Sequence, residues 1–385
     1  MSQKKVKLAI IGLGNMGSAH LNTVNNMPNM DVVAVCDNDP KRLEGITEKY
    51  EIPTFECHKE LLASGIAEAI LICTPHYDHT SIGIDVLNAG IHVIVEKPIS
   101  VHKNDCEKLI AAHTNKDQVF AAMFNQRTNP HYIKLKAMLE KGELGELRRV
   151  NWIITDWFRT AQYYKSGGWR ATWSGEGGGV LMNQCPHQLD LMTWLFGVPS
   201  SVRADVNFGK YHDIEVEDDV TAFLTYPCGA TGVFITTTGE APGTNRLEVV
   251  GTQGKVVIEG SDGIKFIRNE EDSQVFCDTT DQGFATPSIW NVDIPVRGSG
   301  KQHLGILENF ADVILNGADL IAPAEEGINS VELANAMIYS GLKNETVSFP
   351  IDGDAYEAML KGLIANSTHV KETVETKVAD LANTY

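Results

Sequence analysis

The stretch 6-VKLAIIGLGNMGSAHLNTV-24 decides the fold of the first half of this chain. Its apolar run Val6–Ile11 predicts a buried strand, and the pattern over Met16–Asn25 predicts a helix. The turn between them reads G-x-G-x-x-G, with Gly12, Gly14 and Gly17 at the fixed positions. The motif alone is weak in a chain with 34 glycines, but a strand before it and a helix after it indicate a dinucleotide-binding turn.

Each residue of this turn has an expected task. Gly12 permits the tight turn, Gly14 leaves room for a pyrophosphate, and Gly17 lets the helix pack on the sheet. Asn15 and Met16 open the helix, whose N-terminal N–H groups face the phosphates. The alternative is an ordinary glycine-rich turn between a strand and a helix.

Asp37 ends the second predicted strand, 20 residues after Gly17. A carboxylate there accepts hydrogen bonds from the ribose hydroxyls of NAD and repels the 2′-phosphate of NADP. NAD is therefore the expected cofactor and NADP the less favoured one, although Lys41 and Arg42 lie close enough to soften the preference. The alternative for Asp37 is a turn or cap residue before Pro40.

The alternation of short apolar runs with helical patterns predicts an α/β fold whose first domain, residues 1–125, is a doubly wound parallel sheet of the Rossmann type. Its expected strands are Val6–Ile11, Val32–Cys36, Ala69–Cys73, Ile91–Val95 and Val119–Met123. Its expected later helices are Ser81–Asn88 and Lys103–His113.

After residue 125 the rhythm changes, and residues 126–385 are expected to form an α+β domain with a large, open, mostly antiparallel sheet. The expected strands are Leu147–Asp156, Val202–Phe208, Val220–Tyr226, Thr231–Thr238, Arg246–Val250, Lys255–Glu259 and Thr346–Phe349. The expected helices are Pro130–Glu140, Pro186–Phe196, Gly305–Leu315, Ser330–Leu342 and a helical tail from Ala355.

Composition argues against several classes of partner. The 385 residues carry 50 acidic and 32 basic side chains, a formal charge of −18, which repels nucleic acid and anionic lipid. The seven cysteines are scattered and form no C-x-x-C pair, so we expect neither disulfides nor a metal site. The N-terminal apolar run is too short for a signal segment, and no stretch approaches the ~20 apolar residues of a membrane span, so we expect a cytoplasmic protein.

Further motifs give the chain a resemblance to the Gfo/Idh/MocA family, the glucose–fructose oxidoreductase and inositol dehydrogenase relatives. The matching segments are AIIGLGNMG at 9–17, ICTPHYDH at 72–79, VEKPIS at 95–100, GGGVLMNQCPHQLDL at 177–191 and the helical segment 306–337. The resemblance spans nearly the whole chain, and it implies a dehydrogenase that holds NAD in the first domain and its substrate between the domains. It also implies a homodimer or homotetramer, which an uncovered sheet face would favour.

The resemblance implies a role for each matching residue. Lys97 binds the reacting hydroxyl beside the cofactor, His187 accepts its proton, and Asp190 binds a second hydroxyl. The residues that line the cofactor are Thr74, Pro75, His79, Glu96, Lys97 and Gln126, with Trp169 and Arg170 standing near the nicotinamide or the substrate.

The chemistry of these residues supports the same reading. Oxidation of an alcohol removes the hydroxyl proton, and a neutral histidine accepts protons near neutral pH. An ammonium nearby stabilises alkoxide charge. Asn183, His187 and Asp190 share one helical face if the helix starts early, but Pro186 favours a start at that residue and leaves Asn183 on the segment leading in. Many relatives carry Asp at position 183, and Asn there cannot hold a charge, which shifts the proton work to His187 and Lys97.

The segment 151–173 is rich in Trp, Tyr and Arg. Aromatic faces suit the C–H faces of sugar rings, and arginine suits hydroxyls or carboxylates, so Arg159, Tyr163, Tyr164 and Arg170 are candidate substrate contacts, the alternative being a core or interface cluster. We therefore expect an NAD-dependent dehydrogenase that oxidises a ring hydroxyl of a sugar, sugar derivative or cyclic polyol, or the reverse. The alternatives are a glycoside-cleaving enzyme that oxidises its substrate transiently with tightly bound NAD, and a non-catalytic NAD or sugar sensor.

Overall fold

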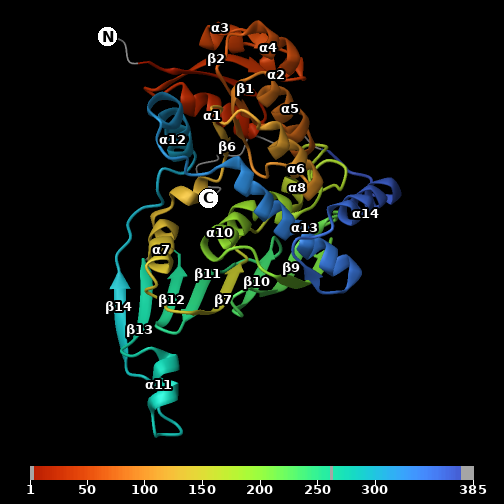
Figure 1. The fold of residues 1–385 in the computed structure, drawn as a ribbon. Helices are drawn as coiled ribbons and strands as arrows, with labels where there is room; N and C mark the ends of the chain where they lie inside the picture. The colour runs from red at the N-terminus through yellow and green to blue at the C-terminus, as the bar shows by residue number, and fades with distance from the viewer. Residues whose placement is uncertain (1–3, 261–262, 374–385) are drawn as a thin grey trace.

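The first half of the chain folds around a parallel sheet, as predicted. The computed structural model describes residues 4–260 and 263–373 (Figure 1). In the described chain the sheet has six strands in the order β3-β2-β1-β4-β5-β6, and every neighbouring pair is parallel. The strands are β1 (Val6–Ile11), β2 (Met30–Cys36), β3 (Thr54–Phe55), β4 (Ala69–Ile72), β5 (His92–Val95) and β6 (Phe120–Ala122).

The order of these strands positions the site. Chain order reverses between β1 and β4, which lie side by side, and ligands of such sheets bind at the carboxyl ends next to that reversal. Strands β4 and β5 are almost entirely buried because helices cover both faces of the sheet. The segments that follow β1, β4 and β5 therefore meet at one edge.

The helices of this half are α1 (Asn15–Val24), α2 (Pro40–Leu43), α3 (Ile46–Tyr50), α4 (His58–Ser64), α5 (His76–Asn88) and α6 (Lys103–Ala112). Helix α5 begins at His76, five residues before the predicted Ser81, because Pro75 forms its N-cap and the polar first turn hides the apolar periodicity. His79 is therefore a helical residue.

The second half forms a mixed, mostly antiparallel sheet, which confirms the predicted class. In the described residues its order is β14-β13-β12-β11-β7-β10-β9-β8-β15, and only β7 and β10 run parallel. The strands are β7 (Leu147–Ile154), β8 (Ser201–Phe208), β9 (Glu217–Thr225), β10 (Thr231–Thr237), β11 (Asn245–Gly251), β12 (Gly254–Glu259), β13 (Ile264–Asn269), β14 (Ile289–Ile294) and β15 (Val347–Ser348).

Helices α10 and α13 pack between this sheet and the first domain (Figure 1). The helical segments of this half are α7 (Pro130–Glu140), α8 (Ala161–Tyr164), α9 (Val180–Asn183), α10 (Pro186–Phe196), α11 (Ser273–Thr279), α12 (Gln302–Asn316), α13 (Gly327–Lys343) and α14 (Gly353–Asn366), with the 3-10 turns η1 (Asn125–Thr128) and η2 (Ala324–Glu326). The helical tail predicted from Ala355 ends at Asn366, and its last part, 374–385, lies outside the described residues.

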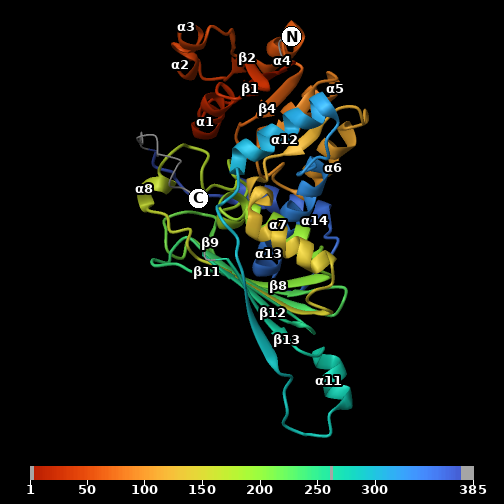
Figure 2. The same cartoon turned by 90° about the vertical axis from the view of Figure 1, so that its left-hand side faces the viewer.

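An arm made of β13, α11 and β14 projects away from the body in both views (Figures 1 and 2). The sequence prediction missed it, although β14 reads IWNVDI, and most side chains of that strand are exposed. Ile289 and Trp290 of β14 and Phe223 of β9 are each more than half exposed. Such apolar surface is consistent with self-association, which stays a prediction.

The two halves share one hydrophobic core because the chain returns to the first domain late in the sequence. The Ala122 N–H donates to the Ala322 carbonyl, and α12 lies beside η1. Lys103 Nζ on α6 also donates to Glu332 Oε1 of α13. The division at residue 125 stays a prediction, since residues on both sides of it contribute to the shared core.

Replacing Gly17 by alanine should destabilise the fold, whereas the same change at Gly14 should not. A Cβ at Gly17 would lie 1.8 Å from the Gly12 carbonyl oxygen, whereas a Cβ at Gly14 would lie 3.4 Å from Arg42 Nη1. We expect Gly17→Ala to lower Tm by about 5 °C, the effect of a rigid overpacking contact, and Gly14→Ala to leave Tm nearly unchanged. Equal Tm losses measured by thermal unfolding would contradict this reading of the turn.

Candidate functional site

The glycine turn after β1 is held by the end of β2. Gly12 N–H donates to the Cys36 carbonyl at 2.8 Å. Asp37, which is 6% exposed, accepts from the Leu13 N–H at 2.6 Å and from the Asp39 N–H at 2.9 Å. Arg42 Nη1 lies 3.6 Å from Asp37 Oδ2. The carboxylate thus braces the turn from the side on which a ribose would lie.

The neighbouring turn after β4 completes a cradle that fits a dinucleotide. Gly14 is the N-cap of α1, and no side chain caps this helix N-terminus. Thr74 Oγ1 is buried without a hydrogen-bond partner in the described part of the chain, and Pro75 begins α5 beside it. An orphaned hydroxyl facing an uncapped helix end suits a polar ligand laid across the two turns.

His79 was predicted to line the cofactor, but both of its ring nitrogens contact backbone carbonyls. Its Nδ1 lies 2.8 Å from the Pro98 carbonyl and its Nε2 lies 2.8 Å from the Thr74 carbonyl. The side chain is 1% exposed. His79 therefore ties the turn after β4 to the turn after β5, and any effect on the cofactor passes through Thr74.

Glu96 follows β5 and is buried as an ionised carboxylate. Its Oε1 lies 2.7 Å from His20 Nε2, and its Oε2 accepts from the Lys97 N–H at 3.1 Å. Burial alone would raise the pKa of Glu96, but the hydrogen bond and charge of His20 outweigh it, and the pKa falls to about 2. The negative charge beside Lys97 is therefore permanent.

Lys97 reaches from the first domain into the second. Its Nζ donates to the Asn183 carbonyl at 2.9 Å. Burial lowers the pKa of Lys97 below its ordinary value, while Glu96 and Glu176 oppose the shift. Asn183 is the last residue of α9, so this hydrogen bond joins the E-K-P turn to the segment that precedes α10.

His187 lies in the first turn of α10, directly after Pro186, and is 2% exposed. Burial and the charge of Lys97 hold the pKa of His187 well below its ordinary value, with a smaller contribution from His303 on α12. The imidazole is therefore neutral at neutral pH. Lys97 Nζ reaches the Asn183 carbonyl, four residues before His187, so the chain brings the two residues into one region; their joint catalytic role stays a prediction.

The predicted helical face of Asn183, His187 and Asp190 does not form, because α9 ends at Asn183 and α10 begins at Pro186. The proline ring favours the first turn of a helix and breaks the continuity. Asn183 lies on the segment that leads into α10, which was the alternative considered for it.

Asp190 has a different task from the one expected. Arg127 Nε donates to Asp190 Oδ2 at 2.9 Å and Arg127 Nη2 donates to Oδ1 at 2.6 Å. The two side chains are 1% and 2% exposed, and Arg127 Nη1 also donates to Glu326 at 2.5 Å. Both carboxylate oxygens are thus engaged in a buried ion pair that fixes α10 against η1 and η2.

Sequence reasoning missed Glu176, a carboxylate 1% exposed beside the site. Its Oε2 accepts from the Ala171 N–H at 2.6 Å, and Asn183 Nδ2 donates to its Oε1. Burial raises the pKa of Glu176, while Arg170 opposes the shift. The available signal was the acid within the glycine run at 175–179, where a surface charge would have no reason to lie.

The other predicted substrate and cofactor residues divide into two groups. Arg170 Nη1 donates to Tyr163 Oη at 2.6 Å, with Trp169 on the other side of its guanidinium, close to Lys97. Tyr164 instead turns to the sheet, where its hydroxyl lies 2.7 Å from Thr238 Oγ1. Gln126 Nε2 donates to Gln302 Oε1 at 3.2 Å, which links η1 to α12.

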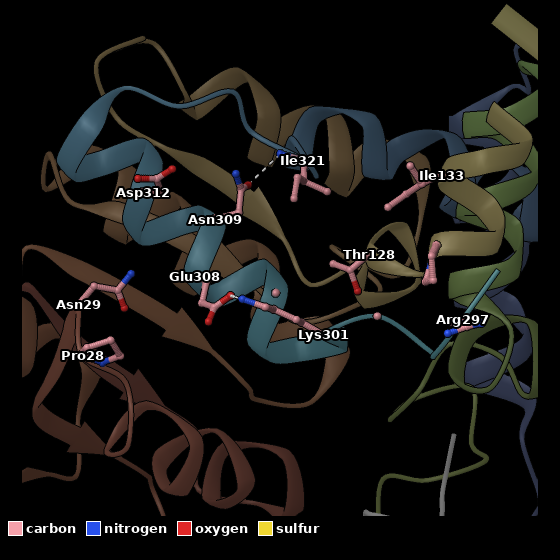
Figure 3. A pocket seen from close by; sticks show the side chains of 13 residues that line it. Pro28, Asn29, Thr128, Ile133, Arg297, Lys301, Glu308, Asn309, Asp312 and Ile321 are labelled. Atoms are coloured by element: carbon pink, nitrogen blue, oxygen red, sulfur yellow. Dashed lines mark hydrogen bonds and ion pairs between the residues drawn. The ribbon is translucent and has the colours of Figure 1, made fainter. Parts of the chain in front are cut away.

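A pocket on the first domain lies elsewhere (Figure 3). It is bounded by Pro28 and Asn29 before β2, by Thr128, and by Lys301 and Glu308 of α12, which form a 2.6 Å ion pair. Asn29 is at the amino end of β2 and Asp37 is at the carboxyl end. This pocket is therefore at the opposite edge of the sheet from the catalytic candidates.

Within residues 4–260 and 263–373, no helix has both the length and the apolar character that a membrane crossing requires. In the same residues, no group of three or more His, Cys, Asp or Glu side chains is arranged to hold a metal ion.

Comparisons with known proteins agree with this geometry. Residues 6–124 match the family model described as "Oxidoreductase family, NAD-binding Rossmann fold", and residues 132–257 match the model for the GFO/IDH/MocA C-terminal domain. An inositol 2-dehydrogenase of Rhizobium meliloti is 23% identical over 355 residues, covering 89% of this chain and 99% of that protein.

Solved structures are similar over the same extent. The WlbA dehydrogenase of Chromobacterium violaceum, in complex with NADH and UDP-GlcNAcA, has a TM-score of 0.77 at 26% identity, covering 91% of this chain and 98% of that one. Levoglucosan dehydrogenase with NADH and L-sorbose has a TM-score of 0.76 at 21% identity, covering 91% and 100%, and supports the fold. The chain belongs to the Gfo/Idh/MocA family and is an NAD-binding oxidoreductase that acts on CH–OH groups.

Proposed function

We propose that this protein oxidises a ring hydroxyl of a sugar, sugar derivative or cyclic polyol, or reduces the corresponding ketone, with Lys97 and His187 as its catalytic residues. One observation carries the proposal: at the carboxyl edge of the dinucleotide-binding sheet, the partly buried Lys97 Nζ donates to the Asn183 carbonyl, four residues before the buried His187. Relatives named for inositol and levoglucosan support a cyclic, hydroxyl-rich substrate.

Different residues around the cradle would bind different parts of the cofactor. Gly12, Gly14, Gly17 and the start of α1 would hold the pyrophosphate, and Asp37 would take the ribose hydroxyls. Thr74 and Pro75 would border the nicotinamide half, near Trp169. NAD, when bound, accepts the hydride that leaves the substrate carbon.

The proton chemistry belongs to the protein. Lys97 would donate a hydrogen bond to the reacting hydroxyl and stabilise its oxygen as negative charge develops there. His187 would accept the hydroxyl proton, which a neutral imidazole can do and an imidazolium cannot. Asn183 donates to Glu176 through Nδ2, so its amide oxygen would be the atom offered to a second substrate hydroxyl.

Replacing Lys97 by methionine should abolish most activity without weakening cofactor binding. Loss of the ammonium removes charge stabilisation at the reacting oxygen, so we expect kcat/KM to fall about 100-fold or more. NADH formation at 340 nm would be followed with cyclic polyols, free sugars, anhydrosugars and glycosides. Lys141→Met, an exposed position after α7, is the matched control and should behave as the wild type.

The same panel separates the alternatives. Cleavage of a glycoside without net NADH would indicate transient oxidation with retained NAD. Cofactor binding without turnover of any substrate would indicate a sensor and would overturn the proposal.

The pH profile of oxidation should be bell-shaped. Protonation of His187 removes the proton acceptor, and because its pKa is lowered by burial and by Lys97, the acid limb should lie below pH 6.5. Deprotonation of Lys97 removes the ammonium, and because burial lowers its pKa, the alkaline limb should lie below pH 10.5. The charged groups facing this pair are Glu96, Glu176, Arg159 and Arg170, with His303 also beside it. To assign the acid limb to His187, kcat/KM should also be measured in His187→Gln, where that limb should disappear.

Asp190 should prove to be a positioning residue. Asp190→Asn weakens a buried ion pair and leaves Arg127 with less compensation, a loss of about 3 kcal/mol, so we expect Tm to fall by about 5 °C and KM to change less than about threefold. Asn183→Ala is the comparison, in which we expect KM to rise; Tm should also fall somewhat, because Glu176 loses a hydrogen-bond donor. A large rise in KM with an unaltered Tm in Asp190→Asn would restore a direct substrate contact.

A further inference from the structure

Arginine and aromatic side chains of the segment 157–170 alternate in a stack close to Lys97. The guanidinium of Arg159 lies 5.4 Å from the Trp157 ring centre and 5.2 Å from the Tyr163 ring centre. The guanidinium of Arg170 lies 4.4 Å from the Tyr163 ring centre and 4.8 Å from the Trp169 ring centre. Each guanidinium therefore lies beside two aromatic rings, which restrict its orientation.

Both arginines retain donors that the protein does not use. Arg159 Nη1 donates to the Phe158 carbonyl at 3.0 Å, and Arg170 Nη1 donates to Tyr163 Oη at 2.6 Å. The Nε atom of each arginine is buried and has no hydrogen-bond partner in the described part of the chain. A guanidinium of restricted orientation with its Nε edge unused suits a planar acceptor with two oxygens, which is the geometry of a carboxylate.

A third cation comes from the segment after α14. Lys371 Nζ donates to the carbonyl of Arg170, and its side chain is partly buried. Two contacts fasten this segment: Ser367 Oγ donates to Glu215, and Glu372 forms a 2.8 Å ion pair with Lys165. Lys371 is thus held against the stack by its own neighbours in the sequence.

The local charge is opposite to the charge of the whole chain. The chain has a formal charge of −18, yet Lys97, Arg159, Arg170 and Lys371 interact within this one region. Three acids face them: Glu96, which pairs with His20; Glu176, whose pKa burial raises and whose Oε1 lies 3.8 Å from Arg170 Nη1; and Asp156, which interacts with Arg159. Grouped cations repel one another in a poorly solvated site, and an anion bound among them would relieve that repulsion.

We propose that Arg159, Arg170 and Lys371 form a carboxylate subsite, so that the physiological substrate is an acidic sugar or polyol whose carboxylate binds there while its ring hydroxyl meets Lys97. This inference rests on the proposed function, because it names the substrate class of the same site.

The test uses pairs of substrates that differ only in charge. The NAD-loaded enzyme would be assayed with uronic acids of several ring configurations and with their uronamides, which are neutral and of nearly the same shape. We expect kcat/KM to be at least about tenfold higher for the acid of a productive pair, equivalent to about 1.4 kcal/mol. Sugar phosphates form a third arm, and a preference for phosphate over carboxylate would overturn the assignment of a planar anion.

Two variants locate the effect. Arg159→Gln and Lys371→Met should each lower kcat/KM for the acid about tenfold and leave that for the amide within about twofold. Lys361→Met, an exposed lysine on α14 paired with Glu357, is the control and should leave both unchanged. Equal use of acid and amide by the wild type, or an acid preference that survives both substitutions, would overturn the subsite.

The failure of this inference is distinguishable from failure of the proposed function. Turnover of neutral substrates without preference for acids would leave the dehydrogenase in place and remove the subsite. If nothing is turned over, calorimetric dissociation constants for the acid and the amide on the NAD-loaded protein decide the subsite alone. Tighter binding of the acid by about tenfold supports it, and equal binding contradicts it.

Discussion

The hydrogen bond from Lys97 Nζ to the Asn183 carbonyl is the constraint on which the site depends. It places an ammonium from the first domain against the start of α10 in the second, in surroundings where a lone charge would be costly. The lysine stays charged because Glu96 is ionised beside it, and Glu96 stays ionised because His20 holds its other oxygen. Successive contacts thus connect His20 on α1, through Glu96 and Lys97, to the end of α9.

The same ammonium determines what His187 can do. A nearby positive charge and deep burial both favour the neutral imidazole. His187 is therefore unprotonated and able to accept a proton, while its protonated form is disfavoured. A base of low pKa is efficient only if another group stabilises the charge that develops on the substrate oxygen, and in the proposed mechanism Lys97 would do so. The two residues are therefore complementary in electrostatics as well as in position, which explains why neither would serve well alone.

Local signals in the sequence predicted the parts of this arrangement that depend on neighbouring residues. The glycine turn, Asp37 and Lys97 each sit at the end of an apolar strand, and parallel strands bring such ends to one edge. The pairing of Arg127 with Asp190 could not be predicted, because 63 residues separate them and nothing local marks either as a partner. Glu176 was missed for a different reason: its partners Ala171 and Asn183 are close in sequence, but an irregular segment shapes their contacts and no periodic pattern marks it. The arm was missed because local sequence does not show that β13 and β14 pair with each other away from the main body (Figure 1).

Net charge is a poor guide to the substrate of this protein. A chain with 18 excess negative charges would repel an anion at long range, but at physiological ionic strength that repulsion is screened beyond about 8 Å. Within that distance the charges that matter are those of Lys97, Arg159, Arg170 and Lys371, and they are basic. Because these cations are partly buried, salt screens them less. Their attraction for a carboxylate at the site therefore exceeds the repulsion from the distant surface charges. An acidic protein can therefore select an acidic substrate, provided that partly buried cations gather at its site and its acids are spread over the surface.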